Sequence, residues 1–578
     1  MSTAISSRLP GAEILKISKA LNRKQLRILN DRIHKLGTLY AKEIPTTIKP
    51  GPITMPNLNL FQTIRGRLLP EAAATNDAGG RAYALPAEAA LARMAATGCL
   101  NGTFYASAET QLDRVLDLAR QVNPDFLART ALYARNRAFM KDMPALLCAV
   151  LAVRDVRRLE EIFPRVIDNG RMLRTFVQIV RSGVTGRKSL GSAPRRCVRR
   201  WLDQADDRRL LEASVGQSPS LADVVKMVRP RPADASREAF YGWLVGRPYN
   251  AGVLPASVRT FEAYKAERVG EPPDVPFQML TALDLGPAEW KSIARRAGWQ
   301  MTRMNLNTFA RQGVLDDPEM VALLARRLAN PALVRKARAF PYQLMAAYRN
   351  AGADVPAPIR EALQDAMEIA LANVPALPGR VVVCPDVSGS MQQPVTGTRA
   401  GSTSWVRCVD VAALVAASLL RVNRESLVLP FEGEVVDLVL NPRDAVITNA
   451  DRLAAVGGGA TNCSAPLARL NAQGVRADLV VFVSDNESWM DPRPSGRSTR
   501  MLEEWERFRQ SNPQARLVCI DLVPNTTTQA PDREDILNIA GFSDAVFDLL
   551  ATFASGADGA ETWIREINQQ TLEERSET

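Results

Sequence analysis

The chain has 578 residues, of which 46% are hydrophobic and 23% charged, a composition typical of globular proteins. A chain of this length is too long to fold around one hydrophobic core. Its apolar runs fall short of the ~20 residues needed to span a bilayer, and its first residues lack the apolar stretch of a secretory signal. Seven scattered cysteines without CxxC spacing and a single histidine, His34, argue against a disulfide framework, a zinc site or histidine-based catalysis. We therefore expect a cytoplasmic, multidomain protein without membrane association.

Charge is divided unequally along the chain. Residues 381–578 contain 17 Arg, no Lys and 27 acidic residues, a net charge of −10, whereas residues 1–380 carry a net charge of +21. Such asymmetry predicts a part that binds a polyanion, joined to a part with another task. The alternative is a basic helical surface without a ligand.

The first 55 residues form a basic extension, in which Leu15–Leu36 is a candidate helix. This segment is either an arm that contacts RNA or a solvated extension. Residues 69–84 are expected to form a loop.

From Pro86 to about Val374 the sequence shows the periodicity of consecutive amphipathic helices, with apolar side chains three or four positions apart. Helices of this length joined by short turns predict stacked helical pairs with a degenerate repeat. The predicted helices are Glu88–Thr97, Ala108–Gln121, Pro124–Met140, Ala145–Val153, Met172–Arg181, Ala193–Leu202, Leu221–Val228, Arg237–Leu244 and Met320–Leu328.

Residues 376–578 alternate predicted strands and helices, which is typical of a mainly parallel sheet covered on both faces. The predicted strands are Arg380–Cys384, Ser426–Phe431, Val435–Leu440, Leu479–Val483, Leu517–Leu522 and Ala545–Asp548. The predicted helices are Val406–Arg421, Ala465–Asn471, Thr499–Gln510, Asp535–Ala540 and Ala551–Ala554.

Hydroxyl and carboxylate side chains follow two of these strands. Asp386, Ser388 and Ser390 come directly after the first strand, and Asp485 follows the strand that begins at Leu479. Thr461 lies behind three glycines in a loop between them. Oxygen ligands at the carboxyl ends of parallel strands suit a hard divalent cation. The alternative is that Ser388 and Ser390 only cap the following helix.

Basic residues are concentrated in two segments of the helical part. In the first, Ser192 is a candidate N-cap and Pro194 lies in the first turn of a helix, which places four arginines on one face. Arginine forks bind phosphate, and Trp201 could stack on a base or simply pack in the core. We predict RNA binding by Arg187, Lys188, Arg195, Arg196, Arg199, Arg200, Lys226, Arg229 and Arg231.

Two resemblances follow from these residues. The set Asp386, Ser388, Ser390, Thr461 and Asp485 resembles the metal-ion-dependent adhesion site of von Willebrand factor A domains, which implies that these side chains hold Mg²⁺ directly or through water. Residues 56–578 resemble the Ro autoantigen family, especially its bacterial orthologues. The segments that carry this resemblance are Gly102–Tyr105, Ala108–Leu116, Ser182–Trp201, Leu221–Pro232, Met301–Leu306 and Val334–Pro341.

The family resemblance implies a fold and partners. We expect an all-α, HEAT-like helical-repeat ring (the TROVE domain, 56–375), followed by a doubly wound α/β von Willebrand factor A domain (376–578). In the family the ring binds Y RNA and the 3′ ends of misfolded non-coding RNA, and a 3′ exoribonuclease such as polynucleotide phosphorylase can be a partner. The family motif commonly has a histidine where this chain has Arg229. A cation is kept there but a stackable, titratable ring is lost, so Y RNA specificity of the usual kind is not assured.

We therefore predict a non-catalytic RNA-binding scaffold of RNA quality control, monomeric within a ribonucleoprotein, whose metal site meets an acidic group of a protein partner. One alternative is a metal-dependent nuclease or phosphatase, although the sequence shows no carboxylate cluster for a second metal. Another is a protein-only scaffold, in which the A domain docks an ATPase.

Overall fold

The computed structural model describes the chain from Leu69 to Leu572, with gaps. The described residues are 69–97, 100–101, 103–337, 339, 341–397, 406–490, 497–523, 525–541, 544–556 and 562–572. The predicted basic extension and its helix at Leu15–Leu36 lie outside these residues. Among the described residues, no helix is both long and apolar enough to cross a membrane.

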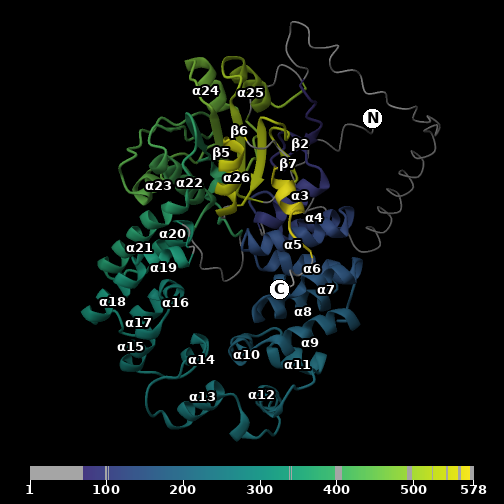
Figure 1. The fold of residues 1–578 in the computed structure, drawn as a ribbon. Coiled ribbons are helices and arrows are strands. Elements are labelled where there is room, and N and C mark those ends of the chain that lie inside the picture. Colours follow the sequence, from purple (N-terminus) through teal and green to yellow (C-terminus); the bar gives the residue numbers. More distant parts are fainter. Residues whose placement is uncertain are drawn as a thin grey trace, which may run out of the picture. The chain divides into compact units, whose positions relative to one another are not determined.

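Helices succeed one another from α3 to α21, and we call this part the helical array (Figure 1). All nine helices predicted in this part are present. The helices are α3 (Ala87–Thr97), α4 (Ala108–Gln121), α5 (Pro124–Asn136), α6 (Asp142–Arg154), α7 (Val156–Val166), α8 (Gly170–Ser182), α9 (Ser192–Gln204), α10 (Asp207–Ser214), α11 (Leu221–Val228), α12 (Ala235–Val245), α13 (Ala256–Glu267), α14 (Phe277–Thr281), α15 (Pro287–Arg296), α16 (Trp299–Met304), α17 (Leu306–Arg311), α18 (Pro318–Leu328), α19 (Pro331–Lys336), α20 (Pro341–Asn350) and α21 (Ala357–Ala370).

Two predicted helix ends are wrong. Helix α5 ends at Asn136 rather than at Met140, because Phe139 adopts a left-handed backbone (φ 58°) that no helix continues. Helix α9 has Gly191 as its N-cap, and Ser192 is its first helical residue, so Ser192 is not the cap. The φ of Gly191 is 72°, a conformation that favours glycine. Pro194 does lie in the first turn, as predicted.

Arginines stabilise the helical array in a repeated way. Arg154, Arg187 and Arg237 each donate from the guanidinium to a backbone oxygen 35 residues earlier. The accepting carbonyls belong to Ala119, Ala152 and Leu202, in the last turns of α4, α6 and α9. A cation at a helix C-terminus satisfies unpaired carbonyls and interacts favourably with the helix dipole. The repeat that the sequence leaves indistinct is thus visible in the spacing of these hydrogen bonds.

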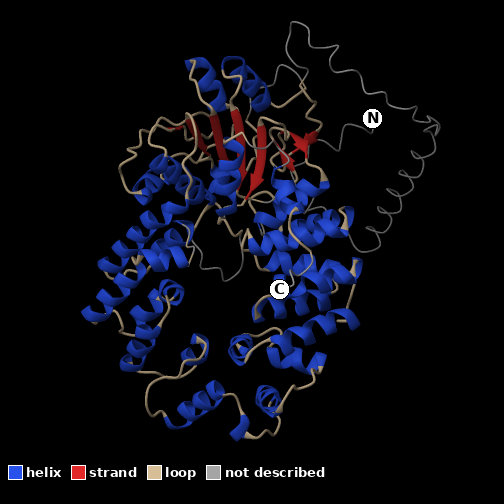
Figure 2. Cartoon of the chain, viewed as in Figure 1, coloured by secondary structure: helices blue, strands red, loops and turns tan. Residues whose placement is uncertain are grey.

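A five-stranded parallel sheet forms the centre of the α/β domain (Figure 2). Its order is β4-β3-β5-β6-β8, with crossovers between strands. The strands are β3 (Val381–Pro385), β4 (Leu427–Val428), β5 (Leu479–Ser484), β6 (Arg516–Asp521) and β8 (Ile536–Ala540).

Alternate strand residues pack into two layers on opposite faces of the sheet. Val383 and Val481 lie in the core with α22 (Cys408–Val422), α23 (Val446–Ala454) and α26 (Asp544–Ala554). Phe482 lies in a second core with α24 (Ala465–Gln473) and α25 (Arg500–Ser511). Helices on both faces explain why the central strands are buried on both sides. This architecture is the predicted doubly wound α/β fold.

Four predictions in the α/β domain are wrong. Asp535–Ala540 was expected to be a helix, but Ile536–Ala540 is strand β8. Ala545–Asp548 was expected to be a strand, but it lies within α26. Val435–Leu440 contains no strand, and the strand predicted at Ser426–Phe431 shortens to β4. Short apolar runs are compatible with either a buried strand or a buried helix, so periodicity alone does not separate them.

Residues 69–84 are not simply a loop. Strands β1 (Ala74–Thr75) and β2 (Arg81–Ala84) form an antiparallel pair, and β2 also pairs with β7 (Thr527–Thr528) of the α/β domain. The partner of β2 lies more than 400 positions away, so local sequence does not reveal the strand.

Both ends of the helical array contact the α/β domain. On α3, Arg93 forms a buried ion pair with Asp521 at the end of β6. On α20, Arg349 pairs with Asp410 of α22 at 3.1 Å and with Asp451 of α23 at 2.5 Å. The array and the domain are therefore joined at two places far apart in sequence.

Candidate metal centre and basic surface

The five predicted cation ligands lie together at the carboxyl edge of the sheet. Asp386 follows β3 and Asp485 follows β5, and these strands are parallel neighbours with Pro385 opposite Val483. The Asp386 amide extends the pairing by donating to the Val483 oxygen at 2.9 Å. Ser388, Ser390 and Thr461 complete the group, and all five residues are at most 4% exposed.

Hydrogen bonds orient the carboxylate of Asp386. Its Oδ1 accepts from the Ser388 amide at 2.9 Å, and its Oδ2 accepts from the Ser484 hydroxyl at 2.6 Å. The hydroxyl oxygens of Ser388 and Ser390 lie 3.3 Å apart. The sequence analysis did not select Ser484 as a site residue. Its position directly before Asp485 at the strand end is the signal that could have identified it.

The glycine loop before Thr461 is held by backbone hydrogen bonds. The Gly458 amide donates to the Val387 oxygen at 2.8 Å, and the Gly389 amide donates to the Gly459 oxygen at 2.8 Å. At Gly457, whose φ is 83°, a Cβ atom would lie 2.4 Å from the Val387 oxygen. Glycine is required there because a side chain would push the loop away from Asp386 and Ser388.

Two carboxyl groups are buried in this site without full compensation. Burial and the nearby charge of Asp485 raise the pKa of Asp386 to about 7, and burial also raises the pKa of Asp485. Asp485 Oδ2 is buried and has no hydrogen-bond partner among the described residues. Buried charges that lack partners are costly, and a bound cation would relieve that cost.

The donor set fits a hard divalent cation. It offers carboxylate and hydroxyl oxygens, the ligands that Mg²⁺ and Ca²⁺ prefer. Within the described part of the chain, no three His, Cys, Asp or Glu side chains group closely enough to hold a metal. The site therefore depends on hydroxyl groups and differs from the carboxylate clusters of two-metal enzymes.

A hollow opens above the site. It has a volume of about 500 Å³ and is lined by Ala78, Phe104, Tyr105, Gly389, Ser390, Gly459, Thr461 and Trp489. Phe104 and Trp489 are 60% and 48% exposed, so aromatic side chains form its rim. The sequence analysis did not connect Phe104 and Tyr105 with this site.

The predicted basic residues divide into two groups. Arg187 donates to the Ala152 oxygen at 2.9 Å, Arg199 donates to the Val228 oxygen at 2.6 Å, and Arg196 pairs with Glu160 at 2.6 Å. These three arginines are engaged within the fold. Of the four arginines predicted to share one face of α9, Arg196 and Arg199 therefore already have partners within the fold.

The remaining six cations are exposed. Arg199 of α9 donates to the Val228 oxygen at the end of α11. The two basic segments are therefore neighbours in the fold. None of the six makes a hydrogen bond or an ion pair through its side chain with the described residues. We call them the basic surface: Lys188, Arg195, Arg200, Lys226, Arg229 and Arg231.

Arg229 is placed by an unusual helix end. It caps α11 in a left-handed conformation, with φ 50° and ψ 67°. Pro230 disfavours a helical conformation at the preceding residue, so the helix ends there and the side chain is exposed.

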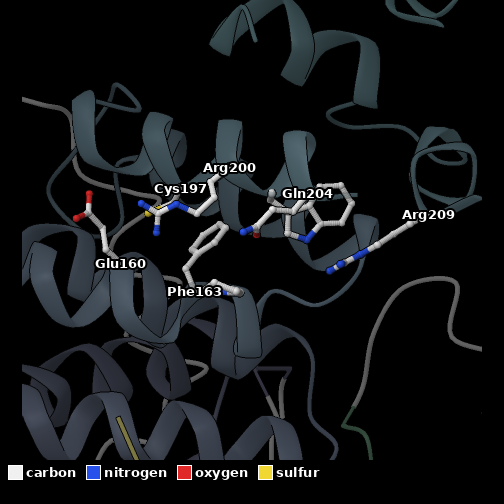
Figure 3. Close-up of a pocket in the computed structure, with 8 residues that line it drawn as sticks. Glu160, Phe163, Cys197, Arg200, Gln204 and Arg209 are labelled. Carbon is white, nitrogen blue, oxygen red and sulfur yellow. The ribbon is translucent and has the colours of Figure 1, made fainter. Parts of the chain in front are cut away.

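Trp201 packs in the core rather than presenting a stacking surface. It is 3% exposed, and its indole nitrogen donates to the Ile167 oxygen at 2.7 Å. The guanidinium of Arg209 lies 4.7 Å from the ring centre. Figure 3 shows the small pocket beside it, where Arg200 and Gln204 of α9 lie near Phe163 of α7. The core alternative for Trp201 is therefore the correct one.

Comparisons with known proteins agree with this architecture. Residues 380–554 match the family model of the Ro60 vWA domain. The chain is 26% identical over 541 residues to the RNA-binding protein RO60 of Deinococcus radiodurans, an alignment that covers 86% of this chain and 98% of the relative. The crystal structure of the D. radiodurans RO (RSR) protein matches with a TM-score of 0.57 at 23% identity, covering 82% of this chain and 100% of that chain. The predicted fold class and the predicted resemblance to the Ro family are confirmed.

Proposed function

Because the chain resembles the Ro family along most of its length and contains a Ro60 vWA domain, we propose that it is an RNA-binding scaffold protein. The observation that carries this proposal is the basic surface over α9 and the end of α11. None of its six exposed cations forms an ion pair or a side-chain hydrogen bond with the described residues, and like charges on one surface repel one another unless an anion binds. A nucleic-acid backbone supplies such anions at regular spacing.

The RNA that fits this surface is a structured non-coding RNA. We propose a Y-like RNA, or the 3′ end of a misfolded RNA, held chiefly through phosphates by Lys188, Arg195, Arg200, Lys226, Arg229 and Arg231. Contacts of this kind fix the position of an RNA without reading its sequence. A 3′ exoribonuclease is the corresponding protein partner in RNA quality control. Arg229 supplies a charge where the family motif commonly has an imidazole, so we expect relaxed specificity.

The cation site serves a separate purpose in this proposal. Asp386, Ser388, Ser390, Thr461 and Asp485 would hold Mg²⁺, which supplies a positively charged attachment point for an acidic group of a protein partner. The chain's own residues keep the oxygens oriented and buried. The aromatic rim formed by Phe104 and Trp489 suits a carboxylate flanked by apolar side chains.

We propose no catalysis. A metal-dependent nuclease is the competing function, and labelled RNA incubated with the pure protein and Mg²⁺ separates the two. The RNA is expected to stay intact. Steady cleavage that disappears in Asp386→Ala would contradict the scaffold role.

RNA binding is tested by charge reversal on the basic surface. We expect Arg195→Glu/Arg200→Glu to weaken binding of a structured RNA at least tenfold, and to reduce the slope of log affinity against log salt by about one per lost phosphate contact. The matched control is Arg476→Glu/Arg507→Glu, which changes the same amount of charge on exposed arginines of the α/β domain. Equal losses in both variants would show a nonspecific charge effect and contradict the proposal.

A further inference from the structure

Two of the predicted cation ligands line the hollow above the site. The hollow has a volume of about 500 Å³, and sites for small ligands usually occupy ~300–1,000 Å³. Ser390 and Thr461 belong to its lining, together with the small residues Gly389 and Gly459. A group that enters the hollow therefore approaches two hydroxyls of the cation site.

Three aromatic side chains line the same hollow. Phe104 and Tyr105 come from the loop between α3 and α4, whereas Trp489 follows β5 in the α/β domain. Phe104, Trp489 and the neighbouring Met490 are exposed. A single exposed apolar side chain is common on a protein surface, but several around one hollow are typical of a site that binds a partner.

Hydrogen bonds fix the backbone of the aromatic rim. The Phe104 amide donates to Gln393 Oε1 at 2.5 Å. The Trp489 amide donates to the Thr461 oxygen at 3.2 Å. The rings of Phe104 and Tyr105 are in edge-to-face contact, with centres 4.8 Å apart. Because the rim is already ordered in the free chain, a partner would lose less binding energy to ordering it.

The turn between β1 and β2 also belongs to this hollow. Ala78 lines it, and the Ala78 amide donates to Glu487 Oε2 at 3.1 Å. Asn76 Nδ2 donates to the oxygen of Ser488, directly before Trp489, at 2.8 Å. The hollow is therefore built from segments more than 400 positions apart in the sequence.

The charges around the hollow select the kind of partner. None of its described lining residues is charged. Carboxylates lie behind the lining, because Glu432 accepts from the Gly459 amide at 2.7 Å and Glu487 accepts from the Ala78 amide. A phosphate backbone needs several lysines or arginines, which this lining does not offer. One carboxylate drawn by a bound cation fits better, and a protein segment supplies it.

We propose that the hollow binds a protein segment in which an acidic residue stands directly beside an aromatic residue. The carboxylate would meet the cation, and the aromatic side chain would pack against Phe104 and Trp489. This binding mode rests on the proposed function of the cation site, and it adds the chemistry that the site selects in a partner. Phe104 and Trp489 are then specificity residues, because every acidic segment offers a carboxylate but few offer a ring beside it.

Short peptides test this proposal on the immobilised full chain by surface plasmon resonance. With Mg²⁺ present, we expect acetyl-Phe-Glu-amide to bind about fivefold more tightly than acetyl-Ala-Glu-amide, the effect of one aromatic contact. We expect acetyl-Phe-Gln-amide, which lacks the carboxylate, to bind at least tenfold more weakly than acetyl-Phe-Glu-amide. Equal affinity of the wild type for the first two peptides would overturn the proposal.

Variants of the rim assign the preference to its residues. We expect Phe104→Ala and Trp489→Ala each to reduce the preference for the aromatic peptide to less than about twofold. Both are expected to bind Mg²⁺ as the wild type does, measured by titration calorimetry. The matched control is Phe139→Ala, which removes an aromatic side chain that is 46% exposed and does not line the hollow. A preference retained in both rim variants, or lost equally in the control, would contradict the proposal.

The remaining outcomes separate this proposal from the cation site. A wild type that binds Mg²⁺ but neither acidic peptide would overturn the proposal and leave the cation site standing. A wild type that does not bind Mg²⁺ would overturn both. A short oligouridylate that binds the wild type and loses affinity in Phe104→Ala and Trp489→Ala would assign the hollow to RNA, which also overturns the proposal.

Discussion

The cation site and the basic surface differ in how their residues are held. At the proposed cation site every predicted ligand is almost fully buried, and the carboxylate of Asp386 is oriented by the Ser388 amide and the Ser484 hydroxyl. On the basic surface, Arg195 and Arg200 are exposed, whereas Arg187 and Arg199 on the same stretch bind helix carbonyls. Residues placed by strand ends can be brought together on the evidence of a short motif. To predict which arginines of a charged surface are free to bind a ligand, one must know which of them already bond to other groups of the protein.

The largest expected effect is the loss of cation binding in Asp386→Ala. Its carboxylate follows the end of β3 and is oriented by hydrogen bonds from Ser388 and Ser484. We expect Mg²⁺ affinity to fall beyond detection by calorimetry. Asp437→Ala, an exposed carboxylate elsewhere in the α/β domain, is the control and should bind as the wild type does. Retained Mg²⁺ binding in Asp386→Ala would contradict a cation site at these residues.

Arg93 shows how a buried charge differs from an exposed one. Arg93→Met leaves Asp521 buried without its partner, and we expect the free energy of unfolding to fall by about 3–5 kcal/mol. Urea unfolding followed by circular dichroism measures the change. Arg120→Met removes an exposed pair with Asp117 and should change stability by less than about 0.5 kcal/mol. Similar losses in the two variants would contradict the role given to burial.

The pH dependence of cation binding follows from the raised pKa of Asp386, about 7. Protons compete with the cation below this pH, so Mg²⁺ affinity should fall about tenfold between pH 8 and pH 6. In the cation-free protein, protonation of Asp386 has the opposite effect and stabilises the folded state. The folded state holds the proton more tightly than the unfolded state does, so this stabilisation is lost as the pH rises through 7. Cation affinity that is constant from pH 8 to 6 would contradict the burial argument.

The smallest effect is expected at Arg199. Arg199→Met removes the hydrogen bond to the Val228 oxygen, and the expected loss of stability is about 1 kcal/mol. We expect RNA affinity to change less than in Arg200→Met, because Arg200 makes no hydrogen bond or ion pair within the described residues. Parallel RNA-binding and unfolding measurements on both variants test this. A larger RNA effect at Arg199 would mean that its remaining nitrogens, rather than those of Arg200, meet the phosphate.

The sequence could bring the residues of the proposed cation site together because most of them lie next to strand ends. Asp386 and Asp485 each directly follow a strand whose apolar run is unmistakable. Strand β2 and the place of Tyr105 in the hollow were missed because β7 and Ser390 lie hundreds of positions away in the sequence. Strand β8 and helix α26 were exchanged because short buried apolar segments of either type look alike.

The basic surface was only partly predictable for another physical reason. An arginine that caps a helix and an arginine that awaits a phosphate have the same side chain and the same charge. Which role Arg187 or Arg195 takes depends on whether a helix end lies within reach, and only the packing of α6 against its neighbours reveals that.

The proposed function places RNA on the basic surface and not at the cation site. The most direct measurement compares the affinity of one structured RNA for Arg195→Glu/Arg200→Glu and for Asp386→Ala, both with Mg²⁺ at one salt concentration. We predict at least a tenfold loss in the first variant and wild-type affinity in the second. Wild-type affinity in the first variant and a loss in the second would contradict RNA binding by the basic surface.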